Sequence, residues 1–126
     1  MRLLLDTAVL IWAASAPERL TRRARTAIQS GGNVLELSAV SLSEIAIKEA
    51  RGKLSFTAAA VHQALEDLGI RVLPYTAHHA FALFDLPLHH RDPFDRQIIA
   101  QALSEDIPVA TPDEKFRLYS GLKIAW

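Results

Sequence analysis

The chain has 126 residues, of which 50% are hydrophobic and 22% are charged, a size and composition typical of one compact domain with a single core. Its 14 basic and 14 acidic residues balance, which excludes a strong overall positive field of the kind that drives sequence-independent nucleic-acid binding. Cysteine is absent, which excludes disulfides and thiolate metal sites, and we expect a single domain over residues 1–126.

The N-terminal segment predicts a short buried strand over residues 2–5 and a helix over residues 7–14, with Thr7 as its N-cap. This apolar stretch resembles a secretory signal, but Asp6 interrupts it, and a carboxylate there opposes membrane insertion. No uninterrupted apolar run reaches the roughly 18 residues of a membrane span. We therefore expect a cytoplasmic protein without a membrane span.

Helices and strands alternate along the rest of the chain. The hydrophobic spacing predicts helices over residues 20–28, 41–51, 57–68, 76–84, 93–105 and 112–119. Short apolar runs predict strands over residues 34–38, 70–73 and 107–111, with a closing strand at 122–126. This alternation predicts an α/β fold in which helices cover both faces of a parallel sheet.

Four acidic residues either follow a predicted strand or lie in the first turn of a predicted helix: Asp6, Glu44, Asp95 and Asp113. Ligands of parallel sheets bind at the carboxyl ends of the strands, so we expect the four acids to face one cleft. Asp6 ends an apolar strand, where an unpaired carboxylate is unfavourable. Asp95 continues the inward-facing apolar stripe of its helix and needs either a bound cation or a core salt bridge.

Some of these acids also have a purely structural explanation. Ser41 and Glu44 fit the capping-box pattern, so Glu44 could serve only the N-terminus of its helix. Asp113 could be no more than a favourable acid in a first helical turn. Asp92, which precedes Pro93 at the first helical position, is better explained as an N-cap than as a ligand.

Clustered carboxylates repel one another unless a cation lies between them, and hard divalent ions bind carboxylate oxygens readily. Mg²⁺ is therefore the expected cofactor, with Mn²⁺ as a possible substitute. A histidine metal site is the weaker alternative. The sequence contains the adjacent pairs His78–His79 and His89–His90, whose members point in different directions in a helix or strand, and it has no HExxH motif.

Four segments taken together carry a family resemblance: LLLDTAVLIW at 3–12, SAVSLSEIAIKEARGKL at 38–54, LPLHHRDPFDRQIIAQA at 86–102 and PVATPDEKF at 108–116. They resemble the PIN-domain family, and most closely the VapC-type toxins of bacterial type II toxin–antitoxin pairs. The resemblance spans nearly the whole chain. It implies a PIN-like α/β/α sandwich with a parallel sheet of about five strands, and Mg²⁺-dependent endonucleolytic cleavage of RNA.

The resemblance also implies a role for each acid. By motif position, Asp6 would be the central metal ligand and Asp95 a second ligand. Glu44 and Asp113 would complete the cluster or bind a second ion. Pro112 fixes the backbone before Asp113, which makes this last acid the least typical of the four.

Further implications concern supporting residues and partners. Thr7 and Thr111 would orient the acids. Relatives often carry a histidine at the position of Ala8 and a tryptophan at that of Ser43, and neither is a ligand. The family's partner is a VapB-like antitoxin whose tail covers the cleft, and relatives usually form homodimers within a larger toxin–antitoxin complex.

We therefore expect metal-assisted hydrolysis of an RNA phosphodiester, with Lys48, Arg91, Arg96 or Lys115 steadying the phosphate backbone. One alternative is a receiver-like Mg²⁺-binding signalling domain, although such domains have adjacent acids after the first strand and Asp6 is single. Another is a catalytically silent PIN-like binding module. Stable phosphorylation would identify the former, and absence of RNA cleavage the latter.

Overall fold

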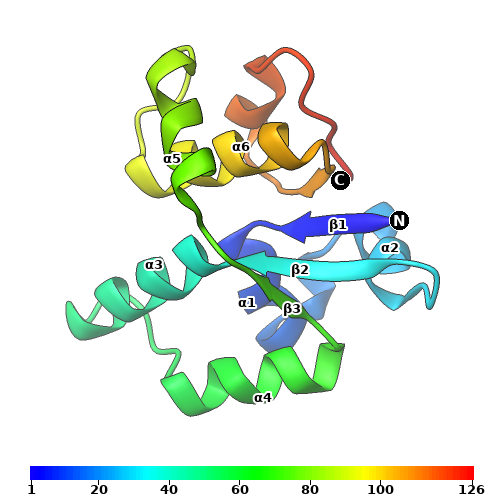
Figure 1. Cartoon of the computed structure of the whole chain (residues 1–126). Coiled ribbons are helices and arrows are strands. Elements are labelled where there is room, and N and C mark those ends of the chain that lie inside the picture. Colours follow the sequence, from blue (N-terminus) through cyan, green and yellow to red (C-terminus); the bar gives the residue numbers. More distant parts are fainter.

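The computed structural model describes residues 1–126 and contains one sheet of four parallel strands in the order β3-β2-β1-β4. Figure 1 shows the first three of these strands side by side. The strands are β1 (Arg2–Leu5), β2 (Val34–Ser38), β3 (Arg71–Leu73) and β4 (Val109–Ala110). In the register of the sheet, Leu5 of β1 is paired with Leu37 on one side and Ala110 on the other. Because every pair is parallel, the carboxyl ends of all four strands lie at the same edge of the sheet.

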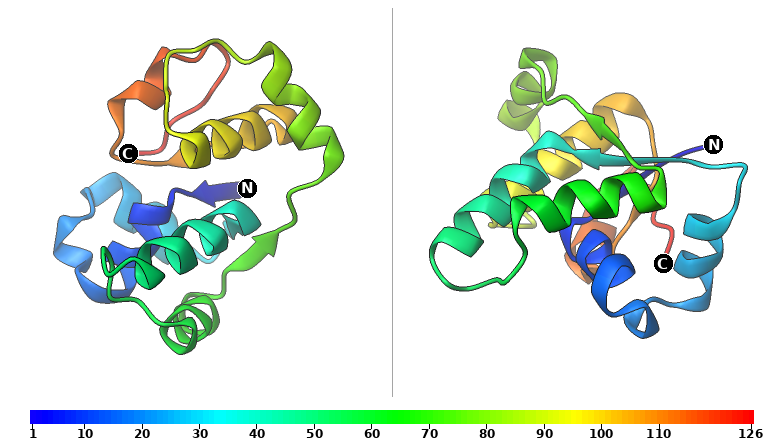
Figure 2. Two further views of the ribbon diagram at one scale, coloured as in Figure 1. Left: turned by 90° about the vertical axis from the view of Figure 1, so that its left-hand side faces the viewer. Right: turned by 90° about the horizontal axis from the view of Figure 1, so that it is seen from below.

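Helices connect the strands and cover both faces of the sheet. They are α1 (Thr7–Ser15), α2 (Arg22–Gln29), α3 (Ala39–Ala50), α4 (Ala58–Leu68), α5 (Ala77–Ala82) and α6 (Pro93–Glu105), with short 3-10 helices η1 (Pro17–Arg19), η2 (Leu83–Asp85) and η3 (Glu114–Leu118). The three views place α1, α2 and α4 on one side of the sheet and α6 with the C-terminal segment on the other (Figures 1 and 2). None of the helices combines the length and the apolar character needed to cross a bilayer.

Two hydrophobic clusters flank the sheet, and alternate residues of β1 feed them. Leu3 and Leu5 belong to the cluster that includes α1 and α4, whereas Leu4 belongs to the cluster built on Ile98 and Ile99 of α6. All three leucines are completely buried, each stabilising the fold by roughly 1.5–3 kcal/mol. Burial on both faces explains why β1 is a continuous apolar run, and it fixes the strand that ends at the acidic pocket described below.

The expected α/β sandwich is confirmed, but the expected closing strand is wrong. Residues 122–126 contribute one isolated bridge, between Val109 and Ile124, so the sheet has four strands. β4 itself is confined to two residues between Pro108 and Pro112, neither of which has an N–H for the ladder. The adjoining segments therefore leave the sheet at both ends of β4.

Several helix boundaries also differ from those expected. α3 begins at Ala39, because Ser38 is the N-cap and its hydroxyl accepts a hydrogen bond from the Val40 N–H at 3.0 Å. The capping-box interpretation of Ser41 and Glu44 is therefore wrong, since both residues lie inside the helix. The expected helix at 76–84 is shortened to α5 followed by η2, and that at 112–119 becomes η3.

Candidate functional site

A pocket of about 420 Å³ is lined by all four acids that the sequence analysis selected: Asp6, Glu44, Asp95 and Asp113. Asp6 follows β1 directly, Glu44 lies on α3, Asp95 lies in the first turn of α6, and Asp113 precedes η3. The parallel sheet brings these positions together from distant parts of the sequence, because each crossover returns the chain to the same edge. Their chemical roles remain predictions.

Asp6 lines this pocket and is only 6% exposed. It occupies the N-cap position of α1, so the expectation that Thr7 is the N-cap is wrong. One carboxylate oxygen, Oδ2, accepts a hydrogen bond of 2.7 Å from the Thr111 hydroxyl. Burial raises the pKa of Asp6 to about 6, and repulsion from Glu44 and Asp113 adds to this effect, whereas the bond from Thr111 opposes it.

Glu44 is held through both of its carboxylate oxygens. The Thr7 hydroxyl donates to Oε1 at 2.7 Å, and the Lys48 ammonium lies 2.6 Å from Oε2. The Thr7 hydroxyl also lies 2.8 Å from that of Ser41, which is fully buried. Since a carboxylate only accepts, Thr7 uses its single proton on Glu44, and Ser41 donates to Thr7. Thr7 therefore positions Glu44 rather than capping α1.

Asp95 has the most strongly perturbed ionisation in the pocket. Burial raises the pKa of Asp95 to about 8, and repulsion from Asp6 and from nearby Asp92, Glu44 and Asp113 contributes further. The backbone around it is fixed, because Oδ1 of Asp92 accepts from the N–H groups of Phe94 at 2.8 Å and Asp95 at 3.1 Å. The expectation that Asp92 is an N-cap is thus confirmed.

His90 is a site residue that the sequence analysis missed. Its Nε2 lies 2.7 Å from Oδ2 of Asp113 and 3.1 Å from Oδ2 of Asp95. The donor atoms of these three residues lie within 4.8 Å of one another, an arrangement that could hold a metal ion. However, Nδ1 of His90 accepts from the Asp92 N–H at 3.2 Å, which places the proton of a neutral ring on Nε2. His90 therefore acts here as a hydrogen-bond donor that positions Asp113.

Of the basic residues suggested for phosphate contacts, only Lys48 lines the pocket. Arg96 is committed elsewhere, since its guanidinium donates to the carbonyl oxygens of Leu86, Pro87 and His90 and thereby fixes the loop before α6. Arg96 does not line the pocket, and its suggested phosphate role stays a prediction. Lys53, which the sequence analysis did not select, does line the pocket.

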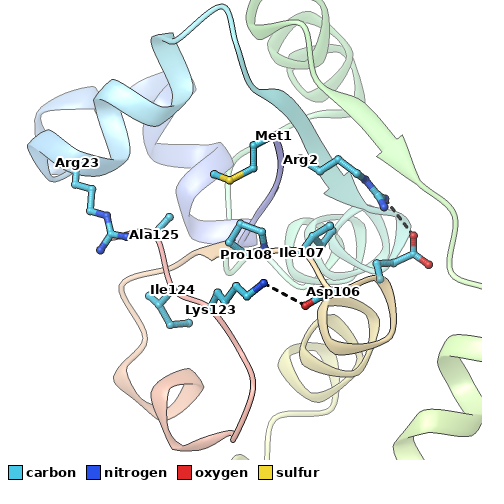
Figure 3. A pocket seen from close by; sticks show the side chains of 10 residues that line it. Met1, Arg2, Arg23, Asp106, Ile107, Pro108, Lys123, Ile124 and Ala125 are labelled. Carbon is cyan, nitrogen blue, oxygen red and sulfur yellow. Dashed lines mark hydrogen bonds and ion pairs between the residues drawn. The ribbon is translucent and has the colours of Figure 1, made fainter.

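A larger cavity, of about 550 Å³, lies near the N-terminus, away from the four acids (Figure 3). Its charged side chains are largely paired: Arg2 contacts Glu105 at 3.1 Å, and Lys123 contacts Asp106 at 3.4 Å. Arg2 also forms a 2.7 Å ion pair with the buried Glu36 of β2. These pairs explain the charges of this cavity structurally, so the acidic pocket is the better candidate site.

The fold and the pocket define an α/β protein that carries a carboxylate cluster at the carboxyl edge of a doubly covered parallel sheet. A family model described as the PIN domain matches residues 3–122. The chain therefore belongs to the PIN-domain family. This membership rules out the alternative of a receiver-like signalling domain.

Solved structures with the same fold come from several bacteria. One is VapBC2 from Rickettsia felis bound to a promoter DNA fragment, in which the matching chain is 16% identical, with a TM-score of 0.74 and coverage of 98% of this chain and 97% of that one. Another is DNA-bound VapBC from Salmonella typhimurium, with 19% identity, a TM-score of 0.68 and coverage of 98% and 96%. A third is VapBC-5 of the VapBC toxin–antitoxin family from Mycobacterium tuberculosis, with 20% identity, a TM-score of 0.60 and coverage of 98% and 96%. No curated protein sequence matches the chain.

Proposed function

We propose that this protein is a divalent-metal-dependent endoribonuclease that acts as the toxin of a type II toxin–antitoxin pair. The observation that carries the proposal is the convergence of four carboxylates on one pocket within a PIN fold. The structural relatives named above come from toxin–antitoxin systems, which supports the toxin assignment.

The residues of the pocket fit a hard divalent cation. Carboxylate oxygens are the donors that Mg²⁺ and Mn²⁺ prefer, and the chain has no cysteine to favour a softer metal. The raised pKa values of Asp6 and Asp95 are those of buried acids that repel one another, and a cation would relieve this repulsion. Asp6 and Asp95 would be the principal ligands, with Glu44 and Asp113 completing the set.

In phosphodiester hydrolysis, a bound divalent ion supplies Lewis-acid stabilisation of developing negative charge and helps to activate water. The contribution of this chain is to hold the carboxylates in place: Thr111 orients Asp6, Thr7 orients Glu44, and His90 orients Asp113. Such hydrogen bonds fix ligands within the small tolerances that catalysis requires.

The proposed partner is a VapB-like antitoxin. An apolar groove of about 380 Å³ between α3 and α4, with Leu42, Ile45, Phe56, Val61 and Leu65 among its lining residues, offers a surface suited to an amphipathic segment. α3 contributes residues both to this groove and, through Glu44 and Lys48, to the acidic pocket. A segment bound in the groove could therefore extend over the pocket and block it.

The function is tested by incubating purified protein with total cellular RNA, in Mg²⁺ or in a chelator. We expect cleavage only with the metal, and a loss of more than about a hundredfold in the Asp6→Asn and Asp95→Asn variants. Asp106→Asn, an exposed acid-to-amide change far from the pocket, serves as the matched control and should cleave normally. Cleavage that persists in chelator or in Asp6→Asn would contradict the proposal, and absence of cleavage under all conditions would favour a silent binding module.

A cellular experiment tests the toxin assignment. Expression of the native chain alone in bacteria should arrest growth, whereas Asp95→Asn expressed to the same level should not. Equal growth with both chains would contradict a toxin role, even if the purified protein cleaves RNA.

A further inference from the structure

Two lysines at the end of α3 line the acidic pocket together with the four carboxylates. Lys48 lies in the last turn of α3, and Lys53 lies just beyond the end of the helix. The side chain of Lys53 is exposed, so packing against the core does not explain why Lys53 lies at the pocket. Its position is explained by the backbone turn that follows α3.

This turn is a Schellman motif. Gly52 has a left-handed backbone with φ of 70°, its N–H donates to the Glu49 carbonyl at 3.0 Å, and the Lys53 N–H donates to the Lys48 carbonyl at 2.9 Å. The two residues joined by this last bond normally make an apolar contact in such a motif. Here both positions are lysine, and both residues line the pocket.

The two lysines differ in how their charges are satisfied. Lys48 forms a 2.6 Å ion pair with Glu44. The side chain of Lys53 makes no hydrogen bond or ion pair, although the pocket that it lines contains four acids. Lys53 thus lines the pocket of the four acids without forming an ion pair with any of them, and its backbone is held by the turn.

We infer that Lys53 binds a phosphate of the nucleic-acid backbone next to the phosphodiester that faces the carboxylates. The inference deepens the proposed nuclease function and rests on it for the class of substrate. A chain with no net charge has no general attraction for polyanions, so local contacts of this kind must hold the strand. A single lysine supplies charge without reading a base, so the contact favours backbone binding over sequence recognition.

The test is the affinity for a fluorescently labelled single-stranded RNA oligonucleotide, measured by anisotropy over a series of salt concentrations. All measurements use an Asp95→Asn background, which suppresses cleavage. We expect Lys53→Ala to weaken binding about fivefold to tenfold at low salt and to reduce the slope of log K against log salt by about 0.7, the value for one lost phosphate contact on a single strand. Lys53→Arg should restore both quantities.

Arg51→Ala is the matched control, because Arg51 is an exposed cation of the same turn that does not line the pocket. It should leave both the affinity and the salt slope nearly unchanged. Thermal unfolding of every variant should match that of the background protein, since neither side chain is buried. A merely structural role of Lys53 would change the unfolding temperature without changing the salt slope.

The results separate this inference from the proposed function. Weaker binding and a smaller slope in Lys53→Ala support the inference even if the native protein cleaves no RNA, in which case the nuclease proposal alone fails. Equal affinities and slopes for Lys53→Ala and its background overturn the inference even if the native protein is an active nuclease. Equal losses in Lys53→Ala and Arg51→Ala also overturn it, because they indicate only a general charge effect.

Discussion

The carboxyl groups of Asp6 and Asp95 lie in a pocket where burial and neighbouring acids both disfavour ionisation. The pKa of Asp6 is raised to about 6 and that of Asp95 to about 8. At neutral pH without a cation, Asp6 is therefore mostly ionised at a cost to stability, whereas Asp95 mostly keeps its proton. The hydroxyl of Thr111 offsets part of this cost for Asp6 through a 2.7 Å hydrogen bond. Stability is reduced at the site where we expect a metal to bind, as is common where function requires clustered charge.

This cost predicts a specific pH dependence for the metal-free protein. The pKa of Asp6 is higher in the folded chain, about 6, than its ordinary value of 3.8, so the folded state binds more protons between these values. Stability from this group is thus highest below about pH 4 and falls as pH rises to about 6. Asp6→Asn removes the titration and keeps an oxygen acceptor for Thr111. Its stability relative to the native chain should rise by up to about 3 kcal/mol between pH 4 and pH 7.

Urea denaturation of both proteins in chelator, across this pH range, measures the difference. Comparing two chains that share every other titrating group removes the contribution of the histidines. A difference in unfolding free energy that stays constant from pH 4 to pH 7 would show that Asp6 is not destabilised in the folded chain.

At the level of helices and strands, the sequence predicted those elements whose ends carry strong local signals. α6 begins at Pro93 as expected, because the Asp92 cap and a proline at the first helical position act together. α3 was misplaced because Ser38 and Ser41 are both good caps, and the choice between them depends on where the buried strand β2 ends. Periodicity carries no information on that point.

Prediction of the candidate site from the sequence was limited in the same way. The four acids were found because each follows or opens a predicted element, where the rules for parallel sheets apply. His90 was missed because it lies in the irregular segment before α6, where side-chain direction depends on contacts such as those with Asp113 and the Asp92 N–H. Lys53 was missed because its direction depends on the turn at Gly52. Contacts of this kind are set by tertiary structure, which no spacing rule encodes.

The role of Asp92 as the N-cap of α6 can be tested by substitution. Its carboxylate holds two N–H groups at the start of α6, so Asp92→Ala should lower the free energy of unfolding by about 1 kcal/mol. Asp92→Asn should retain most of this stability, since asparagine is an equally good N-cap. Chemical denaturation measures both effects. RNA cleavage by Asp92→Asn should remain close to native, and its loss would mean that Asp92 is a ligand rather than a cap.

In the molecule as a whole, the residues that stabilise the fold lie apart from the residues of the candidate active site. Two apolar clusters hold the faces of the sheet, and the paired charges of Arg2, Glu36 and Glu105 link β1, β2 and α6 at some distance from the pocket. At the carboxyl ends of the strands, by contrast, four acids lie close together and repel one another. A cation that binds there should therefore raise the free energy of unfolding of the whole protein.

Mg²⁺ should stabilise the whole protein at pH 8, where the carboxylates would otherwise repel one another. At about one hundred times its dissociation constant, a ligand that binds only the folded state adds about 2.7 kcal/mol, which for a chain of this length raises Tm by about 10 °C. The increase should shrink at pH 5, because the ion must then displace protons from Asp6 and Asp95, whose pKa values lie above that pH. In scanning calorimetry, Mg²⁺ should raise the Tm of the Asp6→Asn/Asp95→Asn double variant hardly at all. The control is Glu66→Gln/Asp67→Asn, which changes two exposed acids of α4, and its Tm should rise with Mg²⁺ as that of the native chain does. An equal response in the two double variants would place the ion elsewhere on the surface and remove the basis for a metal centre in this pocket.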